Sequence, residues 1–350
     1  MQRVTFVRPG LLEWWEVPEP KLEKASDAIV RPIAATTCDV DLYTTQGRTP
    51  FSQAGPYPFG HEFVAEIVEV GEAVYGFHRG QLVVVPFQIS CGECDRCQAG
   101  LTGSCRAVPA RSMYGFGIFG GGQWGGALSD LVRVPFAPKM LVPVPAGVRP
   151  EQVASASDNL PDAWRTVGPQ LLESPGAEVL IVGGAANSIP LYAVGIARAL
   201  GATRVDYLDT DRRRLELADL LGAKLIEGTP PERVGEYPIS VDASADAAGL
   251  ACALRSLAPG GVCTSIGIYY QETPLPLLDM YTRGVRFHTG RANARADMPH
   301  VLKLVQAGRF HPELVTSEVV AWQEAVRVLS GPFFKPVFMR YESASTPSTE

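Results

Sequence analysis

The pattern of apolar and polar positions changes near Gly176. Before that residue, short runs rich in Val and Ile, such as FVAEIVEVG and QLVVVPF, are separated by turn residues. Runs of this length between glycines and prolines are typical of β-strands. The pattern therefore predicts a mainly β domain over about the first 150 residues.

After Gly176, apolar runs of strand length alternate with stretches of helical periodicity. The predicted strands are EVLIVGG, RVDYLDTD, PISVDAS and VCTSIGI, and SIPLYAVGIARALGA, RRRLELADLLGA and GLACALRSLAPGG are predicted helices. This alternation indicates a parallel, doubly wound α/β sheet. Two further helical stretches, DMPHVLKLVQAG and WQEAVRVLSG, and a strand, KPVFMR, come last before a small polar tail.

Length and charge limit the class of protein. A chain of 350 residues is too long for one small core, so two domains are expected. The net charge of -6 argues against nucleic acid and anionic membranes as main partners. We find no apolar run long enough to span a membrane and no signal peptide at the start, so we expect a cytoplasmic protein.

Four cysteines are crowded into the stretch CGECDRCQAGLTGSC, with the spacing C-x2-C-x2-C-x7-C. Such spacing lets four thiolates turn onto one point, which is how a structural zinc is held without an open position. Disulfides are disfavoured in the cytoplasm, and iron–sulfur clusters usually end in Cys-Pro. We therefore expect a structural zinc that cannot activate a substrate. Its ligands are Cys91, Cys94, Cys97 and Cys105.

A candidate dinucleotide loop, GGAANSIP, follows the predicted strand EVLIV and opens a helix. It departs from the G-x-G-x-x-G pattern because Ala185 and Pro190 stand where glycines are expected. Asp209 ends the next predicted strand, where a carboxylate would bind a ribose and repel a 2′-phosphate, which favours NAD over NADP. An α/β core without a nucleotide is the alternative. The candidate cofactor residues are Gly183, Gly184, Ser188, Ile189, Asp209 and Arg214.

A second metal site needs about three protein ligands and an open position. Cys38 in TTCDVDLY, His61 in GHEF and Asp158 in ASDNLPDAW could supply them. Sequence spacing cannot show that these residues meet, and a lone cysteine is most often a buried small apolar residue.

Taken together, these motifs resemble the zinc-dependent medium-chain dehydrogenases, the zinc alcohol dehydrogenase family, and in particular a bacterial subgroup. The resemblance is carried by Cys38, by Gly60-His61-Glu62, by the four-cysteine stretch and by the strand–loop–helix from Glu178 to Asp209. It implies a GroES-like, mainly β catalytic domain at residues 1–158 and 291–350. It also implies a Rossmann NAD-binding domain at residues 159–290.

The resemblance assigns roles to individual residues. Cys38, His61 and Asp158 would hold a catalytic zinc, and Glu62 would be a ligand that can swing in. Asp41 would accept a hydrogen bond from the far nitrogen of His61. Phe87 is either a wall of the substrate pocket or plain core packing, and weaker pocket candidates are Tyr57, Phe116 and Trp124.

The implied reaction is NAD-dependent oxidation of an alcohol or polyol to an aldehyde or ketone, or its reverse, with two zinc ions per chain. A homodimer or homotetramer is expected. The alternatives are a same-fold NADPH reductase of aldehydes or conjugated carbonyls, and a zinc-binding interaction protein without catalysis.

Many relatives relay the alcohol proton through Ser or Thr two residues after the first cysteine. Val40 stands there, so we hypothesise a relay through water with Asp39 or Glu62.

Overall fold

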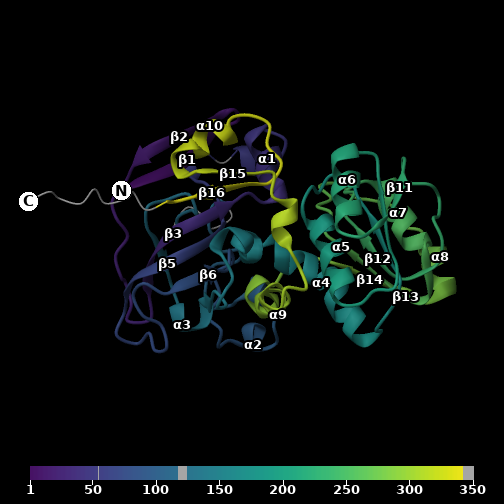
Figure 1. Ribbon diagram of the computed structural model, residues 1–350, viewed down its shortest axis with the longest axis horizontal. Coiled ribbons are helices and arrows are strands. Elements are labelled where there is room, and N and C mark those ends of the chain that lie inside the picture. The colour runs from purple at the N-terminus through teal and green to yellow at the C-terminus, as the bar shows by residue number, and fades with distance from the viewer. Residues whose placement is uncertain (54, 117–123, 342–350) are drawn as a thin grey trace, which may run out of the picture.

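The computed structural model describes residues 1–53, 55–116 and 124–341, which form a β-rich part and an α/β part (Figure 1). In the β-rich part, three strands form a small sheet in the order β2 (Leu11–Glu16), β1 (Gln2–Arg8), β4 (Tyr57–Pro58). The larger sheet has the order β15 (Glu318–Ala321), β16 (Pro336–Met339), β3 (Ala28–Thr36), β5 (Glu62–Val70), β6 (Leu82–Val85), β8 (Val142–Pro143), and β7 (Val132–Val134) also pairs with β3. The end of the chain therefore returns to the sheet that its beginning builds.

The α/β part contains a parallel sheet, with helices around it in Figure 1. Its order is β11 (Lys224–Glu227), β10 (Val205–Asp209), β9 (Val179–Val182), β12 (Tyr237–Asp242), β13 (Leu257–Ser265), β14 (Arg286–Thr289). All four residues of β9 are buried, as a central parallel strand requires. The strand order reverses between β9 and β12, and ligands of such sheets bind at this switch point, beyond the carboxyl ends of the strands.

Helices connect these strands and the two parts. The longer helices are α4 (Asn159–Glu173), α5 (Ile189–Ala199), α6 (Arg212–Leu220), α7 (Ala247–Arg255) and α9 (Ala294–Gln306). Short helices are α1 (Asp39–Thr45), α2 (Asp95–Gln98), α3 (Ala137–Met140), α8 (Leu277–Arg283) and α10 (Ala325–Leu329), with 3-10 turns at Pro50–Gln53, Thr102–Ser104, Pro150–Gln152, Ala154–Ser157, Pro312–Val315 and Trp322–Glu324. Within the described ranges, none of the helices combines the length and apolar character that crossing a membrane demands.

The predicted fold class, a GroES-like β domain with a Rossmann α/β domain, is confirmed. The apolar pattern does not predict α4, whose sequence NLPDAWRTVGPQLLE contains prolines and a glycine that locally signal a turn. Packing overrides that signal, because Leu160, Trp164 and Leu171 of α4 are buried. They join one apolar core that also contains Val64 of β5.

Candidate active site and metal centres

Three side chains from distant parts of the sequence converge at the junction of the two parts. Cys38 follows β3 and is the N-cap of α1, His61 directly precedes β5, and Asp158 directly precedes α4. One ligand atom from each lies within 4.8 Å of the others, and all three residues are buried. His61 Nε2 is 3.3 Å from Asp158 Oδ2. A sulfur, a nitrogen and a carboxylate oxygen so arranged match the donor set of a catalytic zinc, which leaves one position open.

The imidazole of His61 supports this interpretation. Both ring nitrogens are buried, and neither makes a well-aligned hydrogen bond among the described residues, although Asp158 Oδ2 lies near Nε2. Asp41 Oδ1 is 3.8 Å from His61 Nδ1, and Asp41 Oδ2 accepts a hydrogen bond of 2.8 Å from the Cys38 N–H. Buried polar atoms normally have partners, so this ring fits a bound metal on one nitrogen, with Asp41 on the other side.

The electrostatics of Cys38 point the same way. Burial raises the pKa of the Cys38 thiol, and the charges of Asp158 and the neighbouring carboxylates raise it further. A thiolate in these surroundings needs a cation for stabilisation. Zinc would supply that charge, so the residues present fit the ion.

Glu62 is not brought into this group of ligands. Its carboxylate accepts hydrogen bonds from the N–H of Asn159 at 2.7 Å and from the hydroxyl of Ser155 at 3.1 Å. It also forms an ion pair of 2.7 Å with Lys335, and both side chains are buried. Burial lowers the pKa of Lys335, but Glu62 and other nearby acidic groups outweigh this effect, and the net pKa is raised.

Lys335 is a functional candidate that motif analysis missed. Its amine also donates to the carbonyl of Thr37, next to Cys38. A signal was present, because Lys335 is a single charge inside the apolar run PFFKPVF, where a lysine is buried only when it is paired.

Aromatic side chains form one wall beside His61. The ring of Phe116 lies 4.3 Å and that of Phe87 lies 5.6 Å from the imidazole, measured between centroids. Met113 belongs to the same apolar cluster as both rings, and Val40 packs against that cluster. The structure therefore places Phe87 and Phe116 at the metal site.

Tyr57 and Trp124 belong to the core of the β-rich part instead. Tyr57 stacks on Phe6 with 5.0 Å between ring centroids. The ring of Trp124 faces the guanidinium of Arg133 at 5.7 Å.

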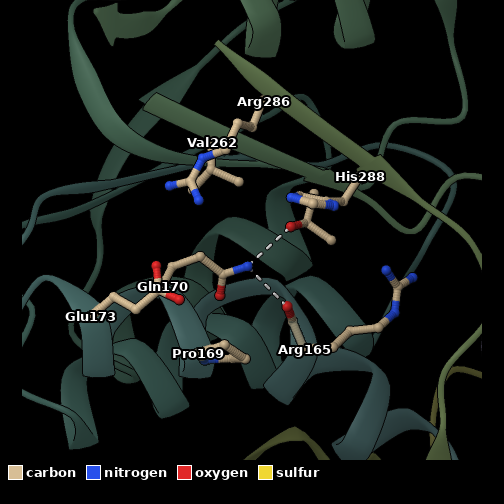
Figure 2. Close-up of a pocket in the computed structure, with 8 residues that line it drawn as sticks. Arg165, Pro169, Gln170, Glu173, Val262, Arg286 and His288 are labelled. Atoms are coloured by element: carbon tan, nitrogen blue, oxygen red, sulfur yellow. Dashed lines mark hydrogen bonds between the residues drawn. The ribbon is translucent and has the colours of Figure 1, made fainter. Parts of the chain in front are cut away.

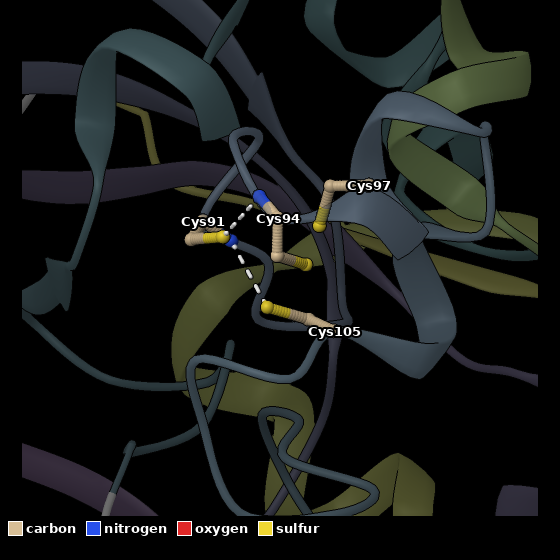
Figure 3. A group of neighbouring side chains, drawn as sticks. All are labelled: Cys91, Cys94, Cys97 and Cys105. Atoms are coloured by element: carbon tan, nitrogen blue, oxygen red, sulfur yellow. Dashed lines mark hydrogen bonds between the residues drawn. The ribbon is translucent and has the colours of Figure 1, made fainter.

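The four cysteines of the predicted structural site lie together around α2 (Figure 3). Their sulfur atoms are all within 4.8 Å of one another. Cys91 Sγ accepts from the N–H of Cys94 at 3.3 Å, and Cys105 Sγ accepts from the N–H of Cys91 at 3.3 Å. Backbone donors of this kind stabilise thiolates, so the group fits a closed tetrahedral zinc.

The candidate cofactor loop joins β9 to α5, with Ser188 as N-cap and Ile189 as first helical residue. A Cβ on Gly183 would lie 2.2 Å from Asp209 Oδ2, and one on Gly184 would lie 2.7 Å from Ser244 Cα. Glycine is therefore required at both positions. Pro190 falls in the first turn of α5, where its missing N–H has no consequence for the helix.

Asp209 ends β10 and is engaged by Arg214 of α6. The guanidinium donates from Nε to Oδ2 at 2.7 Å and from Nη2 to Oδ1 at 2.8 Å. Burial acts to raise the pKa of Asp209, but Arg214 and nearby N–H groups more than offset it, and the pKa is lowered. Asp209 is thus a carboxylate at the expected place, already paired with a cation.

A separate pocket of about 360 Å³ lies between α4 and the β13–β14 edge of the sheet (Figure 2). Arg165, Gln170, Arg286 and His288 line it, and Gln170 Nε2 bonds the hydroxyl of Thr264 at 3.2 Å. None of its lining residues is a candidate metal or cofactor ligand.

Comparison with known proteins defines the class. The family models of the alcohol dehydrogenase GroES-like domain and of the zinc-binding dehydrogenases match residues 24–146 and 189–307. A probable zinc-binding alcohol dehydrogenase of Mycobacterium tuberculosis is 30% identical over 317 residues, which cover 89% of this chain and 79% of that protein. A glutathione-independent formaldehyde dehydrogenase of Pseudomonas aeruginosa is 32% identical over 268 residues, 70% of this chain and 65% of that protein. The structure of alcohol dehydrogenase TADH from Thermus sp. ATN1 is 29% identical, with a TM-score of 0.86 over 97% of this chain and 100% of that one.

These matches and the site geometry define an oxidoreductase that acts on alcohols. Its fold combines a GroES-like domain and an NAD-type α/β domain. The chain belongs to the zinc-dependent medium-chain dehydrogenases, and the family resemblance seen in the sequence is confirmed.

The four-cysteine group generates a prediction about zinc content. We expect Cys97→Ser to contain one zinc per chain fewer than the wild type and to unfold at lower temperature, because a hydroxyl is a poor zinc ligand. Elemental analysis and thermal unfolding measure both. Cys263→Ser is the matched control, since Cys263 is a buried free cysteine outside the group and should keep the full zinc content. Equal zinc in Cys97→Ser and wild type would contradict the assignment.

The buried pair of Glu62 and Lys335 generates a prediction about stability. Lys335→Met removes the cation and leaves a buried unpaired carboxylate, which should cost about 3–5 kcal/mol. In the double variant Glu62→Gln with Lys335→Met no charge is left, so most of the loss should be recovered. Urea unfolding of the wild type, the single variant and the double variant measures the loss and its recovery. The ion pair is unimportant if the single and double variants unfold at the same urea concentration.

Proposed function

We propose that this protein oxidises an alcohol or polyol to an aldehyde or ketone with NAD, or runs the reverse reaction. The observation that carries the proposal is the buried group of Cys38, His61 and Asp158 beside the apolar wall of Phe87 and Phe116. The zinc-binding interaction protein is disfavoured, because a second buried set of ligands beside an apolar wall has no purpose in a binding module.

The chain's own residues have distinct tasks in this reaction. When bound, zinc supplies Lewis-acid activation of the substrate oxygen and NAD accepts the hydride. Phe87, Phe116 and Met113 provide an apolar surface that keeps water away from the reacting carbon. Val40 contacts the same cluster and carries no transferable proton. The oxygens of Asp39 and Glu62 are bonded to Ser188, Ile189 and Lys335, so we infer that the proton leaves through water.

The proposed domain boundaries follow the two large sheets. Residues 1–158 and 291–350 would form the catalytic domain, and residues 159–290 the cofactor domain. This division is supported by the pairing of β16 with β3, which ties the end of the chain to the catalytic part.

The proposal predicts a specific loss in Asp158→Ala. Turnover should fall by about 100-fold or more and one zinc per chain should be lost, because two remaining ligands hold zinc poorly. An NAD-coupled absorbance assay over primary alcohols, secondary alcohols and polyols, run beside zinc analysis, measures both. Formaldehyde and other small aldehydes belong in the reverse assay, given the relative of that name. Asp162→Asn is the control, since Asp162 is bonded to Arg165 outside the ligand group. Full zinc content and activity in Asp158→Ala would overturn the proposal.

Cofactor choice is a further prediction. The carboxylate of Asp209 at the end of β10 should repel a 2′-phosphate, so NADH is expected to bind more tightly than NADPH. Fluorescence titration of both cofactors into the zinc-loaded protein measures the preference. The alternative NADPH reductase is supported by one observation, the charge of Arg214 beside Asp209. Tighter binding of NADPH than NADH would overturn the NAD assignment.

We also propose a homodimer or homotetramer that assembles through the β14 side of the α/β part. β14 is an edge strand, and the neighbouring helix α8 exposes Leu277, Leu278 and Tyr281 at 65%, 76% and 84%. Large apolar side chains grouped at a sheet edge are typical of an interface.

A single substitution tests this assembly. Leu278→Asp should shift the protein toward monomer in analytical ultracentrifugation, because a buried charge opposes association. Leu172→Asp, on the exposed face of α4 at 62%, is the matched control and should leave the mass unchanged. If both variants keep the wild-type mass, the interface lies elsewhere.

A further inference from the structure

The N-terminus of α5 is already occupied by an anion, the carboxylate of Asp39. The Ser188 N–H lies 2.9 Å from both carboxylate oxygens, and the Ile189 N–H lies 3.1 Å from Oδ2. The Ser188 hydroxyl donates to Oδ1 at 2.6 Å. Asp39 is 8% and Ser188 0% exposed, so water does not screen this contact.

In a doubly wound fold, this helix end is where the pyrophosphate of a dinucleotide binds. The free N–H groups and the helix dipole attract one anion there. In this chain, Asp39 uses the N–H groups of Ser188 and Ile189 that the phosphates would need. Two anions at a buried helix end also repel each other strongly, because the local dielectric constant is low.

Backbone groups of the candidate cofactor loop also have hydrogen-bond partners within the protein. The N–H groups of Ala185 and Ala186 donate to the carbonyls of Ser244 and Ala243 at 3.1 and 3.2 Å. The hydroxyl of Tyr43 donates to the carbonyl of Ala185 at 2.7 Å. Asp39 and Tyr43 both belong to α1, so this helix braces the cofactor loop at two points.

Asp209, where the ribose would bind, is also hydrogen-bonded within the protein. Besides the two bonds from Arg214, Asp209 accepts from the Tyr207 hydroxyl at 2.9 Å and from the N–H groups of Thr210 and Asp211 at 2.7 and 2.9 Å. A carboxylate has about four acceptor positions, so these partners fill it. A dinucleotide thus has to displace contacts within the protein at both anchor points.

We propose that Asp39 is an internal competitor of the cofactor's pyrophosphate and sets the affinity of this enzyme for its dinucleotide. In the free protein it holds the N-terminus of α5, and it leaves that place when the phosphates bind. The proposal rests on the proposed use of a dinucleotide. Asp39 is not one of the grouped metal ligands, and its carboxylate bonds Ser188 and Ile189, so we expect its effect on cofactor affinity and not on the chemical step.

The test is a binding titration with zinc-loaded protein. Asp39→Asn removes the charge but keeps an oxygen that accepts from the Ser188 N–H, so the helix stays capped. The probes are NADH, NADPH, ADP and adenosine, and calorimetry gives each Kd. Tyr43→Phe is the matched control, because it removes the other brace on the loop and leaves the charge of Asp39 in place.

The expected result is selective for phosphate. Asp39→Asn should bind NADH about tenfold or more tightly than the wild type, and ADP should gain similarly, since the competing anion is gone. Adenosine has no phosphate and should bind equally to both proteins. Tyr43→Phe should bind NADH within about threefold of the wild type. If Asp39→Asn fails to fold, Asp39→Ser replaces it, because its hydroxyl also accepts from the helix.

Several results would overturn the proposal. If the wild type binds NADH and Asp39→Asn binds it no more tightly, competition is excluded while the proposed function stands. An equal gain for adenosine, or an equal gain in Tyr43→Phe, would show that loosening of the loop and not charge is the cause. If neither the wild type nor Asp39→Asn binds NADH or NADPH, the proposed function and this inference both fail. Binding by Asp39→Asn alone supports both.

Discussion

A buried polar network links the metal site to the cofactor loop, and the junction of the two parts depends on it. It starts at Lys335, whose amine is 2.7 Å from Glu62. Glu62 accepts from the N–H of Asn159, and the Asn159 amide is 2.9 Å from the hydroxyl of Ser188. That hydroxyl donates to Asp39. Each buried charge is acceptable only because the next member pairs with it, so the network holds as a unit.

The network explains why residues of both parts share one core. Glu62 and Asp39 come from the β-rich part, Asn159 begins the helix α4 that leaves it, and Ser188 caps a helix of the Rossmann sheet. Apolar attraction is not directional, so it specifies the relative position of two surfaces less sharply than hydrogen bonds and ion pairs do. Paired buried charges are not, because a small displacement leaves a charge unpaired. The polar contacts therefore fix the relative position of the two parts, and with it the place of Asp158 beside Cys38 and His61.

Sequence patterns predicted the parts of this site that have fixed spacing. The four cysteines lie within one short loop, so their convergence follows from local geometry. The parallel, doubly wound character of the Rossmann part followed from the alternation of apolar runs, although its strand order did not. The remaining features are set by tertiary contacts that no local pattern encodes. Lys335 meets Glu62 across 273 positions, and Asp39 meets Ser188 across 149.

Local sequence patterns also could not distinguish among the four aromatic candidates for the substrate pocket. Phe87, Phe116, Tyr57 and Trp124 are all aromatic residues near the motifs, but the structure places the first two against His61 and the others in the β core. Phe87, Phe116 and Trp124 lie on loops and Tyr57 lies in the two-residue strand β4, so no periodicity predicts the direction of these side chains.

Asp39 lies between the metal site and the start of the cofactor helix α5. It is adjacent to Cys38 in the sequence, and its carboxylate accepts hydrogen bonds from Ser188 and Ile189 at the start of α5. Asp41, two residues on, bonds the Cys38 N–H and faces His61. The first turn of α1 thus holds a metal ligand, its supporting carboxylate and the anion at the cofactor helix. Because these three groups lie within residues 38–41, one short segment supports both a metal ligand and the start of the cofactor helix, while Asp41 and Asp39 each serve a different one of the two sites.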